Sequence, residues 1–230
     1  MKIVVAVRCY NEIKNIDRFL RGYDFADNIV VSDGGSMDGS REYLDSLADD
    51  KLRVFHYEER ETINGETWNP DNPHMQFIID RGKELDPDWL IFDDMDCVPN
   101  ATLRQNAREI LSNCDKPQVN AFRLYMWGED RYFPQMNNNF DIDYTSLWAW
   151  KPKELDIHTD MGRKHGTILG VTANHCDILP PEVLLHKSWH PETVQKKMDR
   201  YDKIGIKMNH PTAMAGNPEP LPEYAREWRE

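Results

Sequence analysis

The sequence predicts an α/β fold with a mostly parallel sheet flanked by helices, followed by a more irregular C-terminal half. Over residues 1–115, short β-branched and apolar runs alternate with stretches that carry apolar residues at helical spacing. Strands separated by single helices favour parallel pairing, with helices on both faces of the sheet. In the segment Trp89–Pro99, the four apolar residues 89–92 are followed directly by a cluster of three carboxylates, Asp93, Asp94 and Asp96. A short apolar run bounded by prolines is typical of a buried strand, and its polar end lies where α/β sheets bind ligands.

The first half is expected to alternate strands and helices. We predict strands at Lys2–Val7, Asn28–Ser32, Leu52–Tyr57 and from Trp89 onward. Helices are expected around the apolar positions of residues 13–23, 43–47, 75–85 and 103–111, and Asn100 is placed to cap the last of them. Residues 58–73, which are rich in Asn, Gly and Pro, are expected to form an irregular loop.

The second half changes character. Strands are expected at Gln118–Trp127, Tyr144–Trp150 and Thr167–Ala173, an irregular segment at Asp156–His165, a helix at Pro191–Ile204 and a proline-rich tail from His210. No internal repeat is apparent. We therefore predict one domain over residues 1–230, with a nucleotide-style half at 1–115, a substrate-style half at 116–208 and a Pro-rich surface tail at 209–230.

Composition excludes several classes of partner. With 230 residues, 40% hydrophobic and 10% aromatic, the chain has the composition of a globular protein with a sizeable core. Its net charge of −12 argues against nucleic acid and anionic membranes. No transmembrane segment is expected, because no stretch approaches the roughly 20 apolar residues of a spanning helix. The cysteines are scattered without a CxxC pair, and we see no secretory leader, so we expect reduced thiols and a cytoplasmic location. A homo-oligomer stays open.

The first candidate site is the strand-end loop Asp33–Ser40. Gly34, Gly35 and Gly39 let the backbone turn tightly and approach a ligand, and Asp33 is placed to accept a hydrogen bond from a base or a ribose hydroxyl. The glycine spacing does not match the dinucleotide fingerprint. The alternative interpretation is a plain βα turn with an Asp cap.

The second candidate site is the acidic strand end itself. Asp94 and Asp96, two residues apart, can share a divalent ion, and Mg²⁺ or Mn²⁺ suits such hard oxygen ligands. A solvated acidic turn is the alternative, although adjacent carboxylates repel one another without a counter-ion. His186, after an apolar lead-in, is a candidate further ligand, although a lone histidine is more often structural. His190 and His210 have weaker claims.

The order of these motifs along the chain is itself informative. A first strand ending in Tyr10-Asn11-Glu12, then Asp33-x-Gly35-Ser36-x-Asp38-Gly39-Ser40, then Asp94-Met95-Asp96 resembles the family 2 type glycosyltransferases of the GT-A fold, a Rossmann-like fold with a DxD motif. His186-x-x-Trp189 is similar to the H-x-G-W segment of some members. The resemblance implies metal-assisted transfer of a sugar from a UDP- or GDP-sugar donor to the hydroxyl of a glycan or other acceptor.

The resemblance also implies roles for individual residues. The nucleotide would be held by Arg8, Tyr10, Glu12, Asp33, Gly35, Ser36 and Asp94, and the metal, Mn²⁺ or Mg²⁺, by Asp94, Asp96 and His186. The family's catalytic base has no clear match. Candidates for it are Glu129 and Asp130, with Asp141, Asp143, Asp156 and Asp160 as others. The spacing between the acidic pair and Pro99 is shorter than in the family, so either Asp93 or Asp94 begins the pair.

Other functions fit parts of the same pattern. The strand end also resembles that of haloacid-dehalogenase-like phosphatases, with Asp94 as nucleophile and Asp96 as acid, but this leaves Asp33–Ser40 unexplained. A sugar nucleotidyltransferase would want a basic glycine-rich loop after the first strand, and Arg8–Glu12 is not one. A non-catalytic module that binds nucleotide sugars or glycans is the third alternative. Tryptophans that could stack on a sugar or pack in the core are Trp127, Trp148, Trp150 and Trp189.

Overall fold

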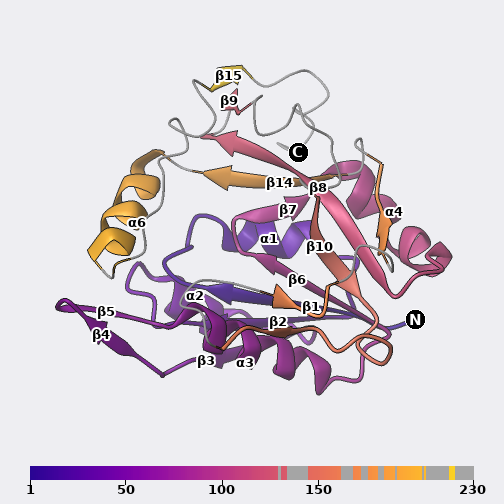
Figure 1. Cartoon of the computed structure of the whole chain (residues 1–230), viewed down its shortest axis with the longest axis horizontal. Helices are drawn as coiled ribbons and strands as arrows, with labels where there is room; N and C mark the ends of the chain where they lie inside the picture. The colour runs from indigo at the N-terminus through magenta and orange to yellow at the C-terminus, as the bar shows by residue number, and fades with distance from the viewer. Residues whose placement is uncertain are drawn as a thin grey trace.

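The computed structural model describes residues 1–128, 131–133, 145–161, 168–171, 176–180, 184–189, 191–203, 205 and 218–220. Within these ranges the main sheet has the strand order β15-β9-β8-β10-β6-β1-β2-β3, with β13 and β14 pairing with β8, and β7 pairing with β14. Figure 1 shows this curled sheet, with helix α6 standing at one side of it. The α/β fold class predicted from the sequence is confirmed.

The N-terminal half forms the parallel part of the sheet. It consists of β1 (Ile3–Cys9), β2 (Asn28–Asp33), β3 (Leu52–His56) and β6 (Trp89–Asp94). β1 is central and pairs in parallel with β2 on one side and β6 on the other. The register sets Arg8 beside Asp94 and Cys9 beside Asp33, so polar residues of three strands meet at one edge of the sheet.

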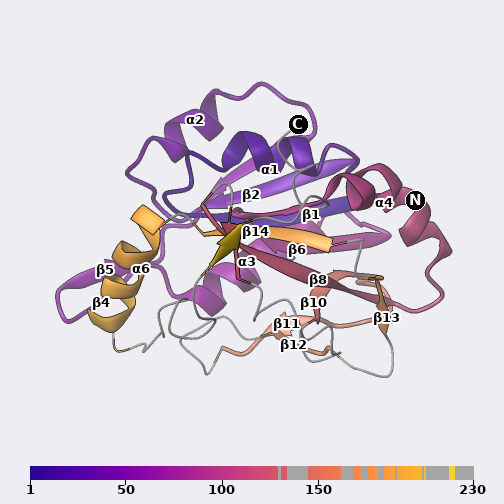
Figure 2. The same cartoon turned by 90° about the horizontal axis from the view of Figure 1, so that it is seen from above.

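Helices cover both faces of this parallel part, as expected. They are α1 (Ile16–Gly22), α2 (Ser40–Ser46), α3 (Asp71–Lys83) and α4 (Ala101–Asn113). Alternate residues of β1 point to opposite faces. Ile3, Val5 and Val7 belong to the core that includes residues of α1, α2 and α4, whereas Val4 and Ala6 pack with α3. Figure 2 shows α1 and α2 on one side of the sheet and α3 on the other. The predicted cap of α4 is confirmed, because Asn100 Oδ1 accepts the Leu103 N–H at 2.9 Å.

The second half extends the sheet mainly with antiparallel pairs. Its strands are β7 (Cys97–Pro99), β8 (Gln118–Trp127), β9 (Arg131–Tyr132), β10 (Thr145–Trp150), β13 (Cys176–Ile178), β14 (Leu184–Trp189) and β15 (Glu219–Pro220). β10 runs antiparallel to both β6 and β8. β14 runs parallel to β8 and antiparallel to β7, which brings the late segment 184–189 beside the acidic turn after β6. Helix α6 (Pro191–Lys203) follows β14 almost directly.

Two expectations about irregular segments are wrong. Residues 58–73 contain a hairpin of β4 (Glu61–Ile63) and β5 (Glu66–Trp68), with Asn64 and Gly65 at φ 52° and 81° in its turn. An Asn-Gly pair favours this two-residue turn, and that signal is present in the sequence. The segment Asp156–His165 carries β11 (His158–Thr159), which pairs with β12 (Ile168–Leu169). Of the strand expected at Thr167–Ala173, only Ile168 and Leu169 form one within the described residues.

None of the described helices is long and apolar enough to cross a membrane.

Candidate functional site

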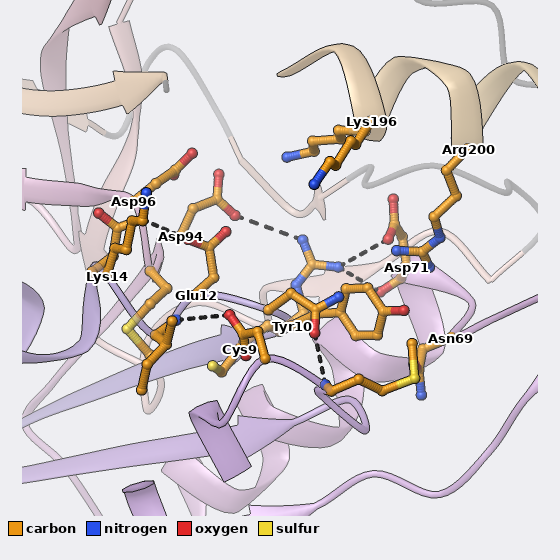
Figure 3. A pocket seen from close by; sticks show the side chains of 18 of the residues that line it. Cys9, Tyr10, Glu12, Lys14, Asn69, Asp71, Asp94, Asp96, Lys196 and Arg200 are labelled. Atoms are coloured by element: carbon orange, nitrogen blue, oxygen red, sulfur yellow. Dashed lines mark hydrogen bonds and ion pairs between the residues drawn. The ribbon is translucent and has the colours of Figure 1, made fainter. Parts of the chain in front are cut away.

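A cavity of about 600 Å³ opens at the carboxyl ends of β1 and β6. The turn after β1 forms one side of it, the acidic turn after β6 a second, and α6 a third. In Figure 3, Lys196 and Arg200 extend from α6 toward a space bordered by Tyr10, Asp94 and Asp96. The carboxyl ends of parallel strands are the usual ligand-binding edge of an α/β sheet, which makes this cavity the candidate site.

The turn after β1 is held in place by the loop after β2. The Ser36 hydroxyl accepts the Asn11 N–H at 2.8 Å, and the Ser40 hydroxyl accepts the Glu12 N–H at 2.9 Å. Asp38 Oδ2 accepts the Ile13 N–H at 3.1 Å. Asn11 has a φ of 57°, a conformation that costs free energy and needs such contacts to persist. The loop after β2 therefore shapes the cavity wall through side-chain-to-backbone hydrogen bonds.

Asp33 is the anchor of that loop. It is fully buried, and its carboxylate accepts the Gly35 N–H at 2.7 Å, the Ser36 N–H at 3.2 Å and Arg41 Nε at 2.8 Å. Burial acts to raise the pKa of Asp33, but hydrogen bonds from Ser36, Arg41 and Gly35 hold it below its ordinary value. Gly35 has a φ of 80°, a conformation that favours glycine, and a Cβ there would also displace the Arg60 guanidinium, 1.5 Å away.

The three carboxylates after β6 point in different directions. Asp93 is buried and accepts the Tyr23 hydroxyl at 2.7 Å and an Arg123 nitrogen at 2.9 Å, and burial raises its pKa. Asp94 and Asp96 line the cavity. Of the three carboxylates, Asp94 and Asp96 therefore line the cavity and Asp93 is buried behind them. That Asp94 begins the functional pair stays a prediction.

Lys187 of β14 compensates the charge of this pair. Its ammonium lies 2.5 Å from Asp94 Oδ2 and 3.3 Å from Asp96 Oδ1, and its side chain is 12% exposed. Arg8 adds a second cation, 3.7 Å from Asp94 Oδ1, and also donates to the Asp71 carbonyl at 3.2 Å. The charge of Lys187, followed by that of Arg8, holds the pKa of Asp94 well below its ordinary value despite burial.

His186 lies away from the cavity. Its strand neighbour Lys187 faces the carboxylates, and adjacent residues of a strand point to opposite faces. The ring is buried, and its burial together with the nearby charge of Arg18 on α1 lowers the pKa of His186 to about 3. The structure does not bring Asp94, Asp96 and His186 together as one ligand set.

The donor set consequently does not fit a resident divalent metal. Among the described residues, no three His, Cys, Asp or Glu side chains are grouped so that they could hold a metal ion. The place between the two carboxylates is taken by an ammonium that both of them contact. A hard divalent ion takes six or more oxygen ligands, and the Lys187 ammonium would have to leave before the two carboxylates could offer even the first two.

Helix α6 contributes a basic side of the cavity. Lys196, Lys197, Arg200 and Tyr201 all line it. The Arg200 guanidinium lies 4.3 Å from the centre of the Tyr10 ring, a cation–π contact that joins α6 to the turn after β1. The far end of α6 is also held, because Asn64 of the β4–β5 hairpin donates to the Lys203 carbonyl at 2.7 Å.

Glu12 faces this basic side from the turn after β1. Its carboxylate accepts the Asn15 amide at 2.6 Å. Burial, followed by the charge of Asp96, raises the pKa of Glu12 to about 7, although Lys197 and Lys187 oppose the shift. Its charge therefore changes near neutral pH, inside the cavity.

The structure gathers part of the predicted nucleotide site. Arg8, Tyr10, Glu12, Asp94 and Asp96 line the cavity, whereas Asp33, Gly35, Ser36 and His186 are not among its described lining residues. The base candidates Glu129, Asp130, Asp141 and Asp143, together with His190 and His210, lie outside the described residues. Asp156 is largely exposed and pairs with Lys83, and neither it nor Asp160 lines the cavity.

Sequence reasoning missed several residues of the site. Asp71, Arg200 and Tyr201 of the cavity lining, and Lys187 beside the acidic turn, belong to no motif and were not predicted. Helix α3 positions Asp71, helix α6 positions Arg200 and Tyr201, and the pairing of β14 with β7 positions Lys187. Strand alternation between His186 and its neighbour could have pointed to Lys187. Of the tryptophans, Trp148 and Trp150 are fully buried in the core, and Trp127 packs edge-on against Phe133 at 5.5 Å. The Trp189 side chain lies outside the described residues.

Comparisons with known proteins give a likeness in structure. No family model matches the sequence, and no curated protein matches it. Among solved structures, residues 1–349 of S. aureus TarS in complex with UDP share 19% identity at a TM-score of 0.52, over 91% of this chain and 68% of that one. The same fragment with UDP-GlcNAc shares 17% at 0.54, over 82% and 59%. A crystal structure of S. aureus TarS shares 18% at 0.54, over 91% and 41%. The likeness shows that this chain shares the fold of part of TarS, and this chain spans only part of each of these structures.

Proposed function

We propose that the chain transfers a sugar from a nucleoside-diphosphate sugar, UDP- or GDP-linked, to an acceptor hydroxyl, in the manner of family 2 type glycosyltransferases. The observation that carries this proposal is the pairing of opposite charges across the cavity. Lysines and an arginine of α6 and the acidic turn after β6 line the same cavity, and the Tyr10 ring lies against Arg200. A nucleoside diphosphate has matching parts, because its phosphates need cations, its ribose hydroxyls need acceptors and its base needs an aromatic or apolar surface.

The cavity offers a place for each part of the donor. Lys196 and Lys197 are available to the diphosphate, since neither forms an ion pair with a carboxylate within the described part of the chain. Asp94 is ionised and faces the cavity, so it can accept a ribose hydroxyl. Tyr10 is placed to stack on the base once Arg200 moves aside. The UDP and UDP-GlcNAc complexes of the structurally similar TarS support this choice of ligand.

The transfer itself requires charge stabilisation and a base. The acceptor oxygen forms a bond to the anomeric carbon, the bond from that carbon to the diphosphate breaks, and the hydroxyl proton passes to a carboxylate. Negative charge develops on the departing diphosphate, and the α6 cations lie on that side of the cavity. Glu129 and Asp130 remain our candidates for the base.

A panel of ligands tests the proposal. We expect UDP or GDP to raise the melting temperature of the protein by several degrees at saturating concentration, whereas inorganic phosphate and ADP do not. Turnover of the matching nucleotide sugar, measured as release of the nucleoside diphosphate, should follow the same base preference. Hydrolysis of sugar phosphates without any nucleotide-induced shift would instead support the phosphatase, and binding without turnover would support a recognition module.

A further inference from the structure

The acidic turn after β6 carries its own cation. Lys187 is brought there by the pairing of β14 with β7, which sets Lys187 opposite Cys97, the residue that follows Asp96. The ammonium contacts Asp94 at 2.5 Å and Asp96 at 3.3 Å. Asp96 is 7% exposed, so its charge is largely removed from water and needs a close counter-ion.

This contact is built into the sheet rather than made by a surface side chain. β14 is also paired in parallel with β8 over the whole segment from Leu184 to Trp189. Lys187 is only 12% exposed. Burial acts to lower its pKa, but the charges of Asp94 and Asp96 hold that pKa well above the ordinary value, so the ammonium stays protonated. A lysine held by two strands and two carboxylates is a fixed positive charge behind the acidic turn, whose carboxylates line the cavity.

We propose that Lys187 is the resident cation of the acidic turn, and that the chain consequently binds its nucleoside diphosphate without a divalent metal. The inference about nucleotide rests on the proposed function. Lys187 neutralises Asp94 and Asp96 from the side of the sheet, so these carboxylates can face the ribose of the bound nucleotide without repelling its phosphates. Lys196 and Lys197 on α6 supply the positive charge that the diphosphate itself requires.

Whether Lys187 occupies the place of a metal ion can be tested without any nucleotide. In a titration with Mn²⁺ alone, followed by the electron paramagnetic resonance signal of the free ion, the unmodified protein should bind no stoichiometric Mn²⁺. Lys187→Ala removes the ammonium and leaves two carboxylates facing each other, so this variant should gain one Mn²⁺ per chain. Adding Asp96→Asn to it should abolish that gain, and Lys153→Ala, an exposed lysine elsewhere, should behave as the unmodified protein.

The second arm measures affinity for UDP and GDP by calorimetry, in EDTA and in Mn²⁺. The unmodified protein should bind its preferred nucleotide within about twofold in the two buffers, whereas Lys187→Ala should lose about tenfold in EDTA and recover it in Mn²⁺. Lys187→Arg keeps the charge and should remain insensitive to EDTA. If Lys187→Ala folds only in Mn²⁺, as judged by melting temperature and circular dichroism, that dependence also supports the assignment.

Two results would overturn it. One is stoichiometric binding of Mn²⁺ by the unmodified protein at a site that Asp96→Asn removes. The other is a loss of nucleotide affinity when the unmodified protein is transferred from Mn²⁺ to EDTA. Failure of every nucleoside diphosphate to bind in either buffer would overturn the proposed function and the claim about nucleotide. The Mn²⁺ titration would still decide whether Lys187 is the cation of the acidic turn.

Discussion

Two acidic strand ends lie at the same edge of the sheet and are compensated in different ways. After β2, buried Asp33 is satisfied by the N–H groups of its own loop and by Arg41. After β6, Asp94 and Asp96 face the cavity and share one ammonium. The donors of Asp33 enclose it within its own loop, outside the cavity lining, whereas Lys187 neutralises Asp94 and Asp96 and leaves them at the cavity surface. The first strand end therefore belongs to the scaffold and the second to the binding site.

The largest expected effect is a loss of turnover when a carboxylate of the second strand end, after β6, loses its charge. Asp96→Asn keeps the shape of the side chain but removes the charge that the Lys187 ammonium contacts at 3.3 Å, and it leaves the bond from Arg18 to the Asp96 backbone carbonyl in place. We expect turnover of the nucleotide sugar to fall by about 10²-fold, with the melting temperature changed by only a few degrees. Steady-state kinetics measures the loss, and Asp88→Asn, an exposed carboxylate far from the cavity, is the control. Unchanged turnover would remove the acidic turn from the site.

At the first strand end, after β2, removing the carboxylate should lower the stability of the protein instead of its activity. Asp33→Ala leaves the N–H groups of Gly35 and Ser36 and the Arg41 guanidinium without their shared acceptor. We expect a loss of about 2–4 kcal/mol in the free energy of unfolding, because buried donors are left unsatisfied and a buried ion pair is broken. Urea denaturation measures it. A variant as stable as the parent but unable to bind nucleotide would contradict the scaffold role and restore Asp33 as a ligand contact.

A smaller effect is expected on the helix that faces the acidic turn. Replacing Lys196 and Lys197 together by alanine should weaken UDP or GDP binding by about tenfold at low salt and by less at high salt, because exposed charges are screened. The melting temperature without nucleotide should not change, since neither lysine forms an ion pair within the described residues. Calorimetry at two ionic strengths provides the measurement, and Lys153→Ala, which removes an exposed lysine elsewhere, is the control. Equal affinity in both proteins would place the diphosphate elsewhere.

The smallest effect concerns Glu12, whose pKa is raised to about 7 by burial and by Asp96. Between the unfolded pKa of about 4.3 and this value, the native carboxyl holds a proton that the unfolded one has lost. Stability from this group is thus fully present below about pH 4.3 and is lost as pH rises through about 7.

Above that pH the ionised Glu12 should also repel the diphosphate. We expect nucleotide affinity to fall a few-fold from about pH 6 to about pH 8, and Glu12→Gln to flatten this dependence. Calorimetry across that range tests both statements. A profile that is equally steep in the variant would assign the dependence to another group.

Local patterns in the chain predicted the parallel half of the fold well. The β-branched run of β1 and the helical spacing after it confirm that strong periodicity identifies an element and the face that it buries. The β4–β5 hairpin was missed because its strands are only three residues long, so composition outweighed the Asn-Gly signal. The short strands of the second half depend on pairing with distant partners, and little in their own residues predicts them.

The sequence by itself determined that carboxylates would stand at the ends of β2 and β6, because the order of apolar and polar residues along a parallel strand sets which end is polar. It also determined that such a cluster needs compensation, since close like charges repel one another. Only the tertiary structure decided what compensates each carboxylate. The donors of Asp33 come from its own loop, but Lys187 is some ninety residues from Asp94 and arrives through the pairing of β14 with β7 and β8. The register between the strands decides such a contact, and a shift of one residue would have turned His186 instead of Lys187 toward the carboxylates.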